Sequence, residues 1–167
     1  MNLTHATVAL LGVLLFAGLP AHAQSPANLS GTWELDRTRS VLPSRASTVS
    51  VALILVIDHQ GVTLKMERRF NVMGIHRTVT STYYTDGREV SNLTPRGDKV
   101  VSRSHWDGAV LVTEHKGTQT RNGKPETLEA TDMKHLSEDG HVLVVDSTTR
   151  VTGQDAPEHA HAVFIRK

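Results

Sequence analysis

Apolar residues recur at every second position in several consecutive runs of this chain, and short turn sequences separate those runs. The run 61–71 shows the pattern clearly, with apolar residues at 62, 64, 66 and 70 and polar residues at 63, 65, 67 and 69. A period of two indicates strands that bury one face. The Asp-Gly pairs at 86–87, 107–108 and 139–140 are typical of hairpin turns, because they accept a positive φ. Short connections join antiparallel strands, so an all-β antiparallel meander is predicted.

The turn positions divide the chain into about ten strands. We expect them at roughly 31–36, 49–58, 61–71, 74–85, 88–93, 98–106, 109–116, 125–136, 141–152 and 161–167. The two best helix candidates, 37–47 and 154–160, each contain a proline and are not expected to form a helix of three turns. A long meander must cover its edges, which favours closure into an up-and-down, lipocalin-like β-barrel of about 8–10 strands. A two-sheet sandwich is the alternative.

The first 23 residues have the pattern of an export signal. The run 6–19 is apolar to weakly polar and too short to span a bilayer, and Ala21-His22-Ala23 fits a small-x-small cleavage site. The expected organisation is therefore a signal peptide at 1–23 and one barrel domain at 24–167, periplasmic or secreted. A buried N-terminal helix and an uncleaved anchor are the alternatives. No other stretch approaches membrane length, so no stable membrane insertion is expected after cleavage.

Charge and composition exclude several function classes. The 18 basic and 17 acidic residues are balanced, which excludes a polybasic nucleic-acid binder. The chain has no cysteine, so disulfides, thiolate metal sites and cysteine nucleophiles are also excluded. The 17 Val and 17 Thr residues after position 23 suit pleated, half-buried surfaces. We expect a monomer with no nucleic-acid partner.

Three short motifs carry a family resemblance. Gly31-Thr32-Trp33 opens the first expected strand, Trp106-Asp107-Gly108 precedes another, and the turn 136–140 precedes a third. This layout resembles the lipocalin and calycin barrels, and among them the exported lipocalin-like proteins of bacteria, most of which have no assigned activity. The resemblance implies that Trp33 plugs the closed end of the barrel under Arg166 or Lys167. It also implies a lumen for a hydrophobic ligand.

Four residues are the candidate ligand-binding set. Arg68 shares a strand face with apolar residues, and Arg77 shares one with Tyr83. A guanidinium pointing into the lumen needs an anionic partner, and a ligand carboxylate is one candidate. Tyr83 and Trp106 would form the wall of the cavity. The alternative is that the strand register bulges, or that each arginine lies at the mouth with its head in water.

Histidines offer a second hypothesis, a metal- or haem-binding barrel. His159 and His161 share a strand face beside Glu158, and His135 and His141 flank a turn. These spacings match no recognised ligand motif, so solvated surface histidines are favoured and no metal or cofactor is assigned. The haem-binding nitrobindins also open with Gly-Thr-Trp, but no other motif of theirs is matched.

Catalysis has little support in the sequence. There is no nucleophile elbow, phosphate loop or zinc-protease motif. Asp132, Glu129 and Glu126 are interpreted as an exposed polar strand face. The sequence therefore favours an exported protein, not an enzyme, that binds a small hydrophobic or amphipathic molecule in a barrel lumen. A barrel filled by its own side chains that serves as a structural or interaction module is the remaining alternative.

Overall fold

The protein is an antiparallel barrel of ten strands. The computed structural model describes residues 26–43, 51–72, 74–94, 97–121 and 123–167, and the predicted signal peptide lies outside them. The strands are β1 Gly31–Leu35, β2 Val51–Gln60, β3 Thr63–Val72, β4 Ile75–Tyr84, β5 Asp86–Leu93, β6 Lys99–Asp107, β7 Val110–Arg121, β8 Lys124–Leu136, β9 Val142–Val151 and β10 Glu158–Arg166. Within the described ranges no helix is long and apolar enough to cross a membrane. The predicted all-β class and strand number are confirmed.

The segments considered as helix candidates are not helical where they are described. β10 begins at Glu158, three residues before the expected start, so the end of 154–160 is strand. In 37–47 the described part is a turn followed by a single bridge from Val41 to His161. This bridge lays the segment after β1 along β10, and both backbone hydrogen bonds between the two residues form at 2.7 and 2.8 Å.

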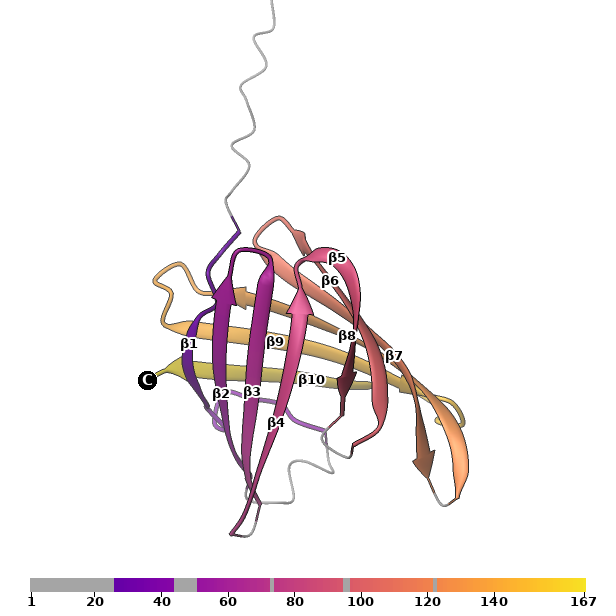
Figure 1. Ribbon diagram of the computed structural model, residues 1–167. Helices are drawn as coiled ribbons and strands as arrows, with labels where there is room; N and C mark the ends of the chain where they lie inside the picture. The colour runs from indigo at the N-terminus through magenta and orange to yellow at the C-terminus, as the bar shows by residue number, and fades with distance from the viewer. Residues whose placement is uncertain (1–25, 44–50, 73, 95–96, 122) are drawn as a thin grey trace, which may run out of the picture.

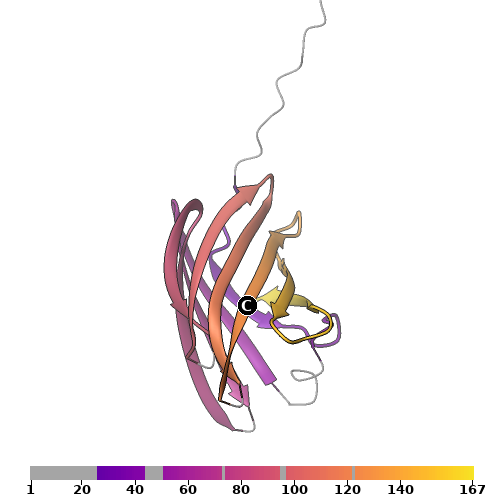
Figure 2. The same cartoon turned by 90° about the vertical axis from the view of Figure 1, so that its right-hand side faces the viewer.

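The strands follow each other around the barrel in chain order. The sheet order is β4-β3-β2-β1-β10-β9-β8-β7-β6-β5, and every ladder is antiparallel. β4 and β5 are the two edges of this sheet, yet they lie next to each other and are joined at Thr85. The barrel is thus nearly closed. In Figure 1 the strands β2–β4 run across β9 and β10, and Figure 2 shows the same barrel turned by 90°. The predicted meander is confirmed, and the sandwich is excluded.

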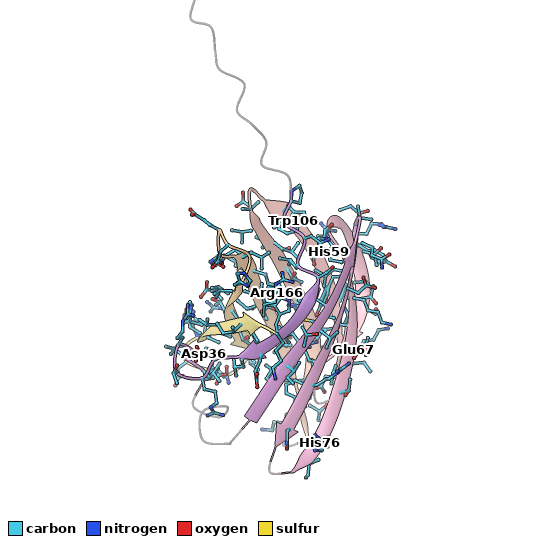
Figure 3. All side chains as sticks on the ribbon, turned by 90° about the vertical axis from the view of Figure 1, so that its left-hand side faces the viewer. Asp36, His59, Glu67, His76, Trp106 and Arg166 are labelled. Carbon is cyan, nitrogen blue, oxygen red and sulfur yellow. The ribbon has the colours of Figure 1, made fainter. Side chains whose placement is uncertain are left out.

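One end of the barrel is filled with apolar side chains. Its most deeply buried members are Leu29, Trp33, Leu64, Leu111 and Leu143, each no more than 1% exposed. Most of them lie two to four residues from the β2–β3, β6–β7 or β8–β9 turn, so these turns cap the cluster. We call this region the packed end. His59 and Trp106 lie there in Figure 3, whereas His76 marks the opposite end.

Trp33 is the plug of the packed end. Its side chain is fully buried, and its indole N–H donates to the Leu29 carbonyl at 3.1 Å. The Arg166 guanidinium lies 4.2 Å from the ring centroid and donates to the carbonyls of Ser30 and Gly140. A Cβ at Gly31 would lie 2.7 Å from Arg166 Nη1, so the missing side chain makes room for this cation. The plug is confirmed with Arg166 as the partner.

Candidate ligand cavity

The inward-facing positions become polar beyond the packed end. Along β7, Leu111 is followed on the same face by Thr113 and His115, and along β9 Leu143 is followed by Val145 and Ser147. The neighbouring strands place further polar side chains at the same level. We call the set the polar belt, and it comprises Ser81, Asn92, Ser102, Ser104, Thr113, His115, Asp132, Lys134 and Ser147.

Asp132 is the anionic centre of the polar belt. Ser147 donates to its Oδ1 at 2.7 Å, and Oδ2 lies 3.3 Å from Lys134 Nζ and 3.4 Å from His115 Nε2. Burial alone raises the pKa of Asp132, but the Lys134 ammonium and the His115 and Ser147 hydrogen bonds outweigh it and hold the pKa far below its ordinary value. The carboxylate is therefore ionised and compensated inside the barrel.

Lys134 is the cation that compensates this charge. Only 5% of its side chain is exposed, and its ammonium also donates to Thr113 Oγ1 at 3.4 Å. The ammonium lies 6.0 Å from the centroid of the Tyr83 ring, which gives it an aromatic face as a further contact. Because a buried charge without a partner is costly, this pair supports the belt only while both members are present.

His115 links the acid to the opposite side of the belt. Its Nδ1 shares a 2.9 Å hydrogen bond with Ser102 Oγ, and Asn92 Nδ2 donates to the same hydroxyl at 3.3 Å. The order Ser102, His115, Asp132 matches that of a hydrolytic triad. However, Ser102 is fully buried and does not line the cavity described below, so its hydroxyl positions the imidazole and does not meet a substrate.

Arg68 enters the lumen from β3 with part of its hydrogen-bonding capacity unused. Its Nη2 donates to Ser81 Oγ at 2.8 Å, whereas its buried Nε has no partner. No described carboxylate forms an ion pair with this guanidinium. A buried N–H donor normally has an acceptor, so this one marks a place where an acceptor can be added.

A cavity of about 210 Å³ lies beside these groups. It is lined by Arg68, Tyr83, Asn92, Leu93, Thr94, Val100, His115, Leu128, Ala130, Asp132 and Thr149. Of the four candidate residues from the sequence, the structure therefore brings together Arg68 and Tyr83. Leu93, Val100, Leu128 and Ala130 add apolar side chains to the lining of the cavity.

Arg77 and Trp106 lie elsewhere. Arg77 is exposed near the start of β4, opposite Phe70 and away from the packed end. This agrees with the alternative from the sequence, in which the head of the arginine lies in water. Trp106 stacks on His59 with 6.1 Å between ring centroids, and burial lowers the pKa of that histidine. Neither residue lines the cavity, so the candidate ligand set narrows to Arg68 and Tyr83.

The sequence interpretation of Asp132 was wrong, and His115 and Asn92 were missed. Glu129 is exposed beside Lys116, as expected of an outer face, but Asp132 lies three positions further and therefore on the opposite face of β8. The available signal was the cross-strand pair of Asp132 and Ser147, two polar residues that face each other on the inner side of β8 and β9.

The histidines of β10 point outward. His159 and His161 are exposed and hydrogen-bonded to Thr148 and Asp146, at 3.1 and 2.6 Å. Across the described part of the chain, no group of three or more His, Cys, Asp or Glu residues is arranged to hold a metal ion. The structure thus adds nothing in favour of the metal-binding alternative.

Solved structures share this fold. Zebrafish ileal bile acid-binding protein, crystallised with cholic acid, matches with a TM-score of 0.59 at 16% identity, over 83% of this chain and 98% of that one. A fatty-acid-binding protein of Echinococcus granulosus matches at 0.53, with 17% identity over 82% and 96% of the two chains. One from Manduca sexta matches at 0.51, with 20% identity over 83% and 99%. No protein-family model and no curated sequence matches the chain. The neighbours are calycin-type barrels, and at these identities they establish the fold alone.

Proposed function

We propose that this protein binds a small amphipathic acid in its lumen, with the ligand carboxylate on Arg68. The observation that carries the proposal is the buried Arg68 Nε, which has no acceptor and belongs to a side chain that lines the cavity. A guanidinium presents two parallel N–H donors to a carboxylate, and Nε is one of the donors that such a pair uses. A carboxylate at this position would satisfy the donor and compensate the charge together.

The arrangement of the cavity predicts which end of the ligand enters first. Arg68, Tyr83 and Asp132 belong to the level of the polar belt, whereas Val100 and Leu128 lie further from the packed end along β6 and β8. A ligand that places its carboxylate on Arg68 therefore lays its apolar part along Val100 and Leu128. The volume of about 210 Å³ suits a short acid.

The structural neighbours support a ligand of this class. Their names assign bile acid and fatty acid binding to barrels of the same topology, and both ligands combine a carboxylate with an apolar body. The proposal for this chain rests on its own Arg68, because a shared fold does not transfer a site.

A displacement titration tests the proposal. A fluorescent anionic probe that reports an apolar site is bound first and then displaced by straight-chain carboxylic acids of six to twelve carbons. Arg68→Leu should weaken the best acid by about 10- to 100-fold, the range expected when a charge-assisted hydrogen bond is lost. Arg77→Leu is the matched control, because Arg77 is exposed on the neighbouring strand, and it should bind as the original protein does.

The corresponding alcohol separates charge recognition from simple burial. It should bind equally to the original protein and to Arg68→Leu, because it gives the guanidinium no anion. If Arg68→Leu binds the acid with unchanged affinity, the proposed role of Arg68 is wrong. If neither protein binds any acid of the series, the carrier function itself is wrong.

We include export in the proposal. The support is the apolar run 6–19 followed by Ala21-His22-Ala23, which predicts a mature chain that begins at Gln24. Intact mass spectrometry of protein recovered from the periplasm or medium of an expressing bacterium tests this, and a mass that includes residues 1–23 contradicts it. Light scattering on the same sample tests the expected monomer.

A further inference from the structure

The charges beside the cavity do not balance. With histidine neutral, Arg68 and Asp132 are the two described side chains on its lining that carry a formal charge. Asp132 already has a cation of its own, because Lys134 Nζ lies 3.3 Å from its Oδ2. The partner that the described residues give to Arg68 is the neutral Ser81 hydroxyl. The three charged groups therefore leave one positive charge, on Arg68, without a counterion.

Lys134 does not serve a ligand as a second cation. Its ammonium is held by Asp132, by Thr113 Oγ1 at 3.4 Å and by the Tyr83 ring, whose centroid lies 6.0 Å away. The side chain is 5% exposed and does not line the cavity. A ligand anion in the cavity thus meets one cationic group, the Arg68 guanidinium, whose buried Nε–H has no acceptor.

Asp132 presents a negative charge to the same cavity. Its side chain is 23% exposed, and it lines the cavity together with Leu128 and Ala130, which precede it on the inner face of β8. Glu126 is the next carboxylate on that face, and it accepts a hydrogen bond from Gln119 at 3.1 Å. The part of β8 beside the cavity therefore has a carboxylate on each side of its apolar side chains.

We propose that Asp132 is the specificity-determining residue that makes the cavity accept monoanionic head groups and reject dianionic ones. The inference rests on the proposed function, because it refines the class of ligand that Arg68 holds. One negative charge on the ligand compensates Arg68. A second negative charge finds no free cation on the lining and is repelled by Asp132. Water reaches the cavity, so this repulsion is moderated but not removed. Carboxylates and sulfates fit this rule, whereas phosphate monoesters and dicarboxylates do not.

Two ligands of the same shape but different charge test the proposal. Octyl sulfate and octyl phosphate share their chain and a tetrahedral head group, and at pH 8 the sulfate carries one negative charge and the phosphate nearly two. Each displaces the fluorescent anionic probe at one fixed ionic strength, because salt screens the repulsion. The quantity compared is the ratio of the two dissociation constants. This ratio cancels the contribution of the octyl chain and any loss of affinity that a variant causes for both ligands.

The original protein should bind octyl sulfate at least about tenfold more tightly than octyl phosphate. Asp132→Asn removes the charge but keeps the size of the side chain, so it should shift the ratio about tenfold towards the phosphate. Asp146→Asn is the matched control and should leave the ratio unchanged, because Asp146 lies on the outer face of the neighbouring strand, 2.6 Å from His161.

Lys134→Met makes the opposite change, because it leaves Asp132 without its cation. It should shift the ratio further towards the sulfate. Since the two substitutions act in opposite directions, a general loosening of the barrel cannot produce both shifts. Lys134→Met also provides the test if Asp132→Asn does not fold.

The outcomes separate this charge selection from the proposed function. If octyl phosphate binds the original protein as tightly as octyl sulfate, the cavity does not select monoanions and the inference is wrong. If the sulfate binds more tightly but Asp132→Asn leaves the ratio unchanged, another group selects the charge, which also overturns the inference. In both cases the proposed function stands as long as Arg68→Leu weakens the carboxylic acids. If no anion displaces the probe from the original protein, the proposed function is wrong and the inference fails with it.

Discussion

The packed end and the polar belt are built by the same strands with the same alternation, yet their interiors are opposites. β7 supplies Leu111 to the packed end and His115 to the belt, and β9 supplies Leu143 and Ser147 in the same way. The packed end excludes water with side chains that need no partner. The belt keeps ionised groups inside the barrel and gives each of them an ion-pair or hydrogen-bond partner. The alternation along a strand therefore decides only that a side chain points inward. Whether that side chain is apolar or polar decides whether the space around it is packed core or cavity.

The two regions also respond differently to the loss of one side chain. In the packed end a truncation leaves a void, and its cost follows the volume removed. In the belt a truncation leaves a charge or donor without a partner, and its cost follows the desolvation of what remains. The following predictions test this difference, beginning with the largest expected effect.

Trp33→Ala should give the largest loss of stability. It removes a fully buried indole, its hydrogen bond to Leu29 and the face on which Arg166 lies. The free energy of unfolding should fall by about 3–5 kcal/mol, measured by denaturant titration. Trp106→Ala is the control, because Trp106 is only partly buried at the edge of the same cluster, and it should cost less. Equal losses in the two variants would contradict the assignment of Trp33 as the plug.

Lys134→Met should cost about 3 kcal/mol in the same titration, although methionine fills a similar volume. The variant keeps the apolar stem but leaves Asp132 without its ammonium partner. The double variant Lys134→Met with Asp132→Leu should recover part of the loss, because neither charge then remains in the lumen. If the double variant is less stable than Lys134→Met, the belt is stabilised by Asp132 itself and the charge argument fails.

A smaller effect is the dependence of stability on pH. The pKa of Asp132 in the folded chain is held below its ordinary value, so the unfolded state binds more protons in acid. This contribution is complete above the ordinary carboxyl pKa of about 4 and is lost as the pH falls below it. Asp132→Asn should therefore flatten the decline of unfolding free energy between about pH 5 and pH 2.5. Parallel declines in the two proteins would show that Asp132 carries no such linkage.

The sequence predicted the architecture because hairpin turns and alternation are local signals. Asp86-Gly87 and the similar pairs placed the turns. The resemblance carried by Gly31-Thr32-Trp33 implied the plug with Arg166 or Lys167 as its partner, and the structure selects Arg166. The polar belt has no local signal, because Asp132 and His115 meet only through the register of β7 with β8. Alternation is also weak from 88 to 106, so neither Asn92 nor Ser102 could be assigned to the inner face. Long-range pairing, which a periodic pattern does not contain, decides the site.

Gly117→Ala tests how closely the wall packs beside the cavity. A Cβ at Gly117 would lie 2.6 Å from the Lys99 carbonyl and 2.8 Å from Val100 Cγ1, and Val100 lines the cavity. Because a ladder backbone cannot move aside easily, we expect a loss of about 1–3 kcal/mol in the free energy of unfolding. Gly108→Ala, in a turn with φ +57° and no atom within 4 Å, should cost about 1 kcal/mol through backbone strain alone. If Gly117→Ala lowers the free energy of unfolding less than Gly108→Ala does, the backbone around Lys99 and Val100 must shift to accommodate the added Cβ.

The smallest expected effect comes from an ion pair on the outer face of the same wall. Arg103 lies 3.1 Å from Glu89 across β5 and β6, and both side chains are more than half exposed. Water already solvates both charges, so Arg103→Met should change the free energy of unfolding by no more than about 0.5 kcal/mol. The ion pair between Asp132 and Lys134 has nearly the same length, 3.3 Å. If Arg103→Met and Lys134→Met lower the free energy of unfolding equally, the distance between the two charges governs the strength of these ion pairs. If Lys134→Met costs several times more, the degree of solvation governs them, and the interior of the belt is a low-dielectric site in which any further buried charge needs a partner of opposite sign.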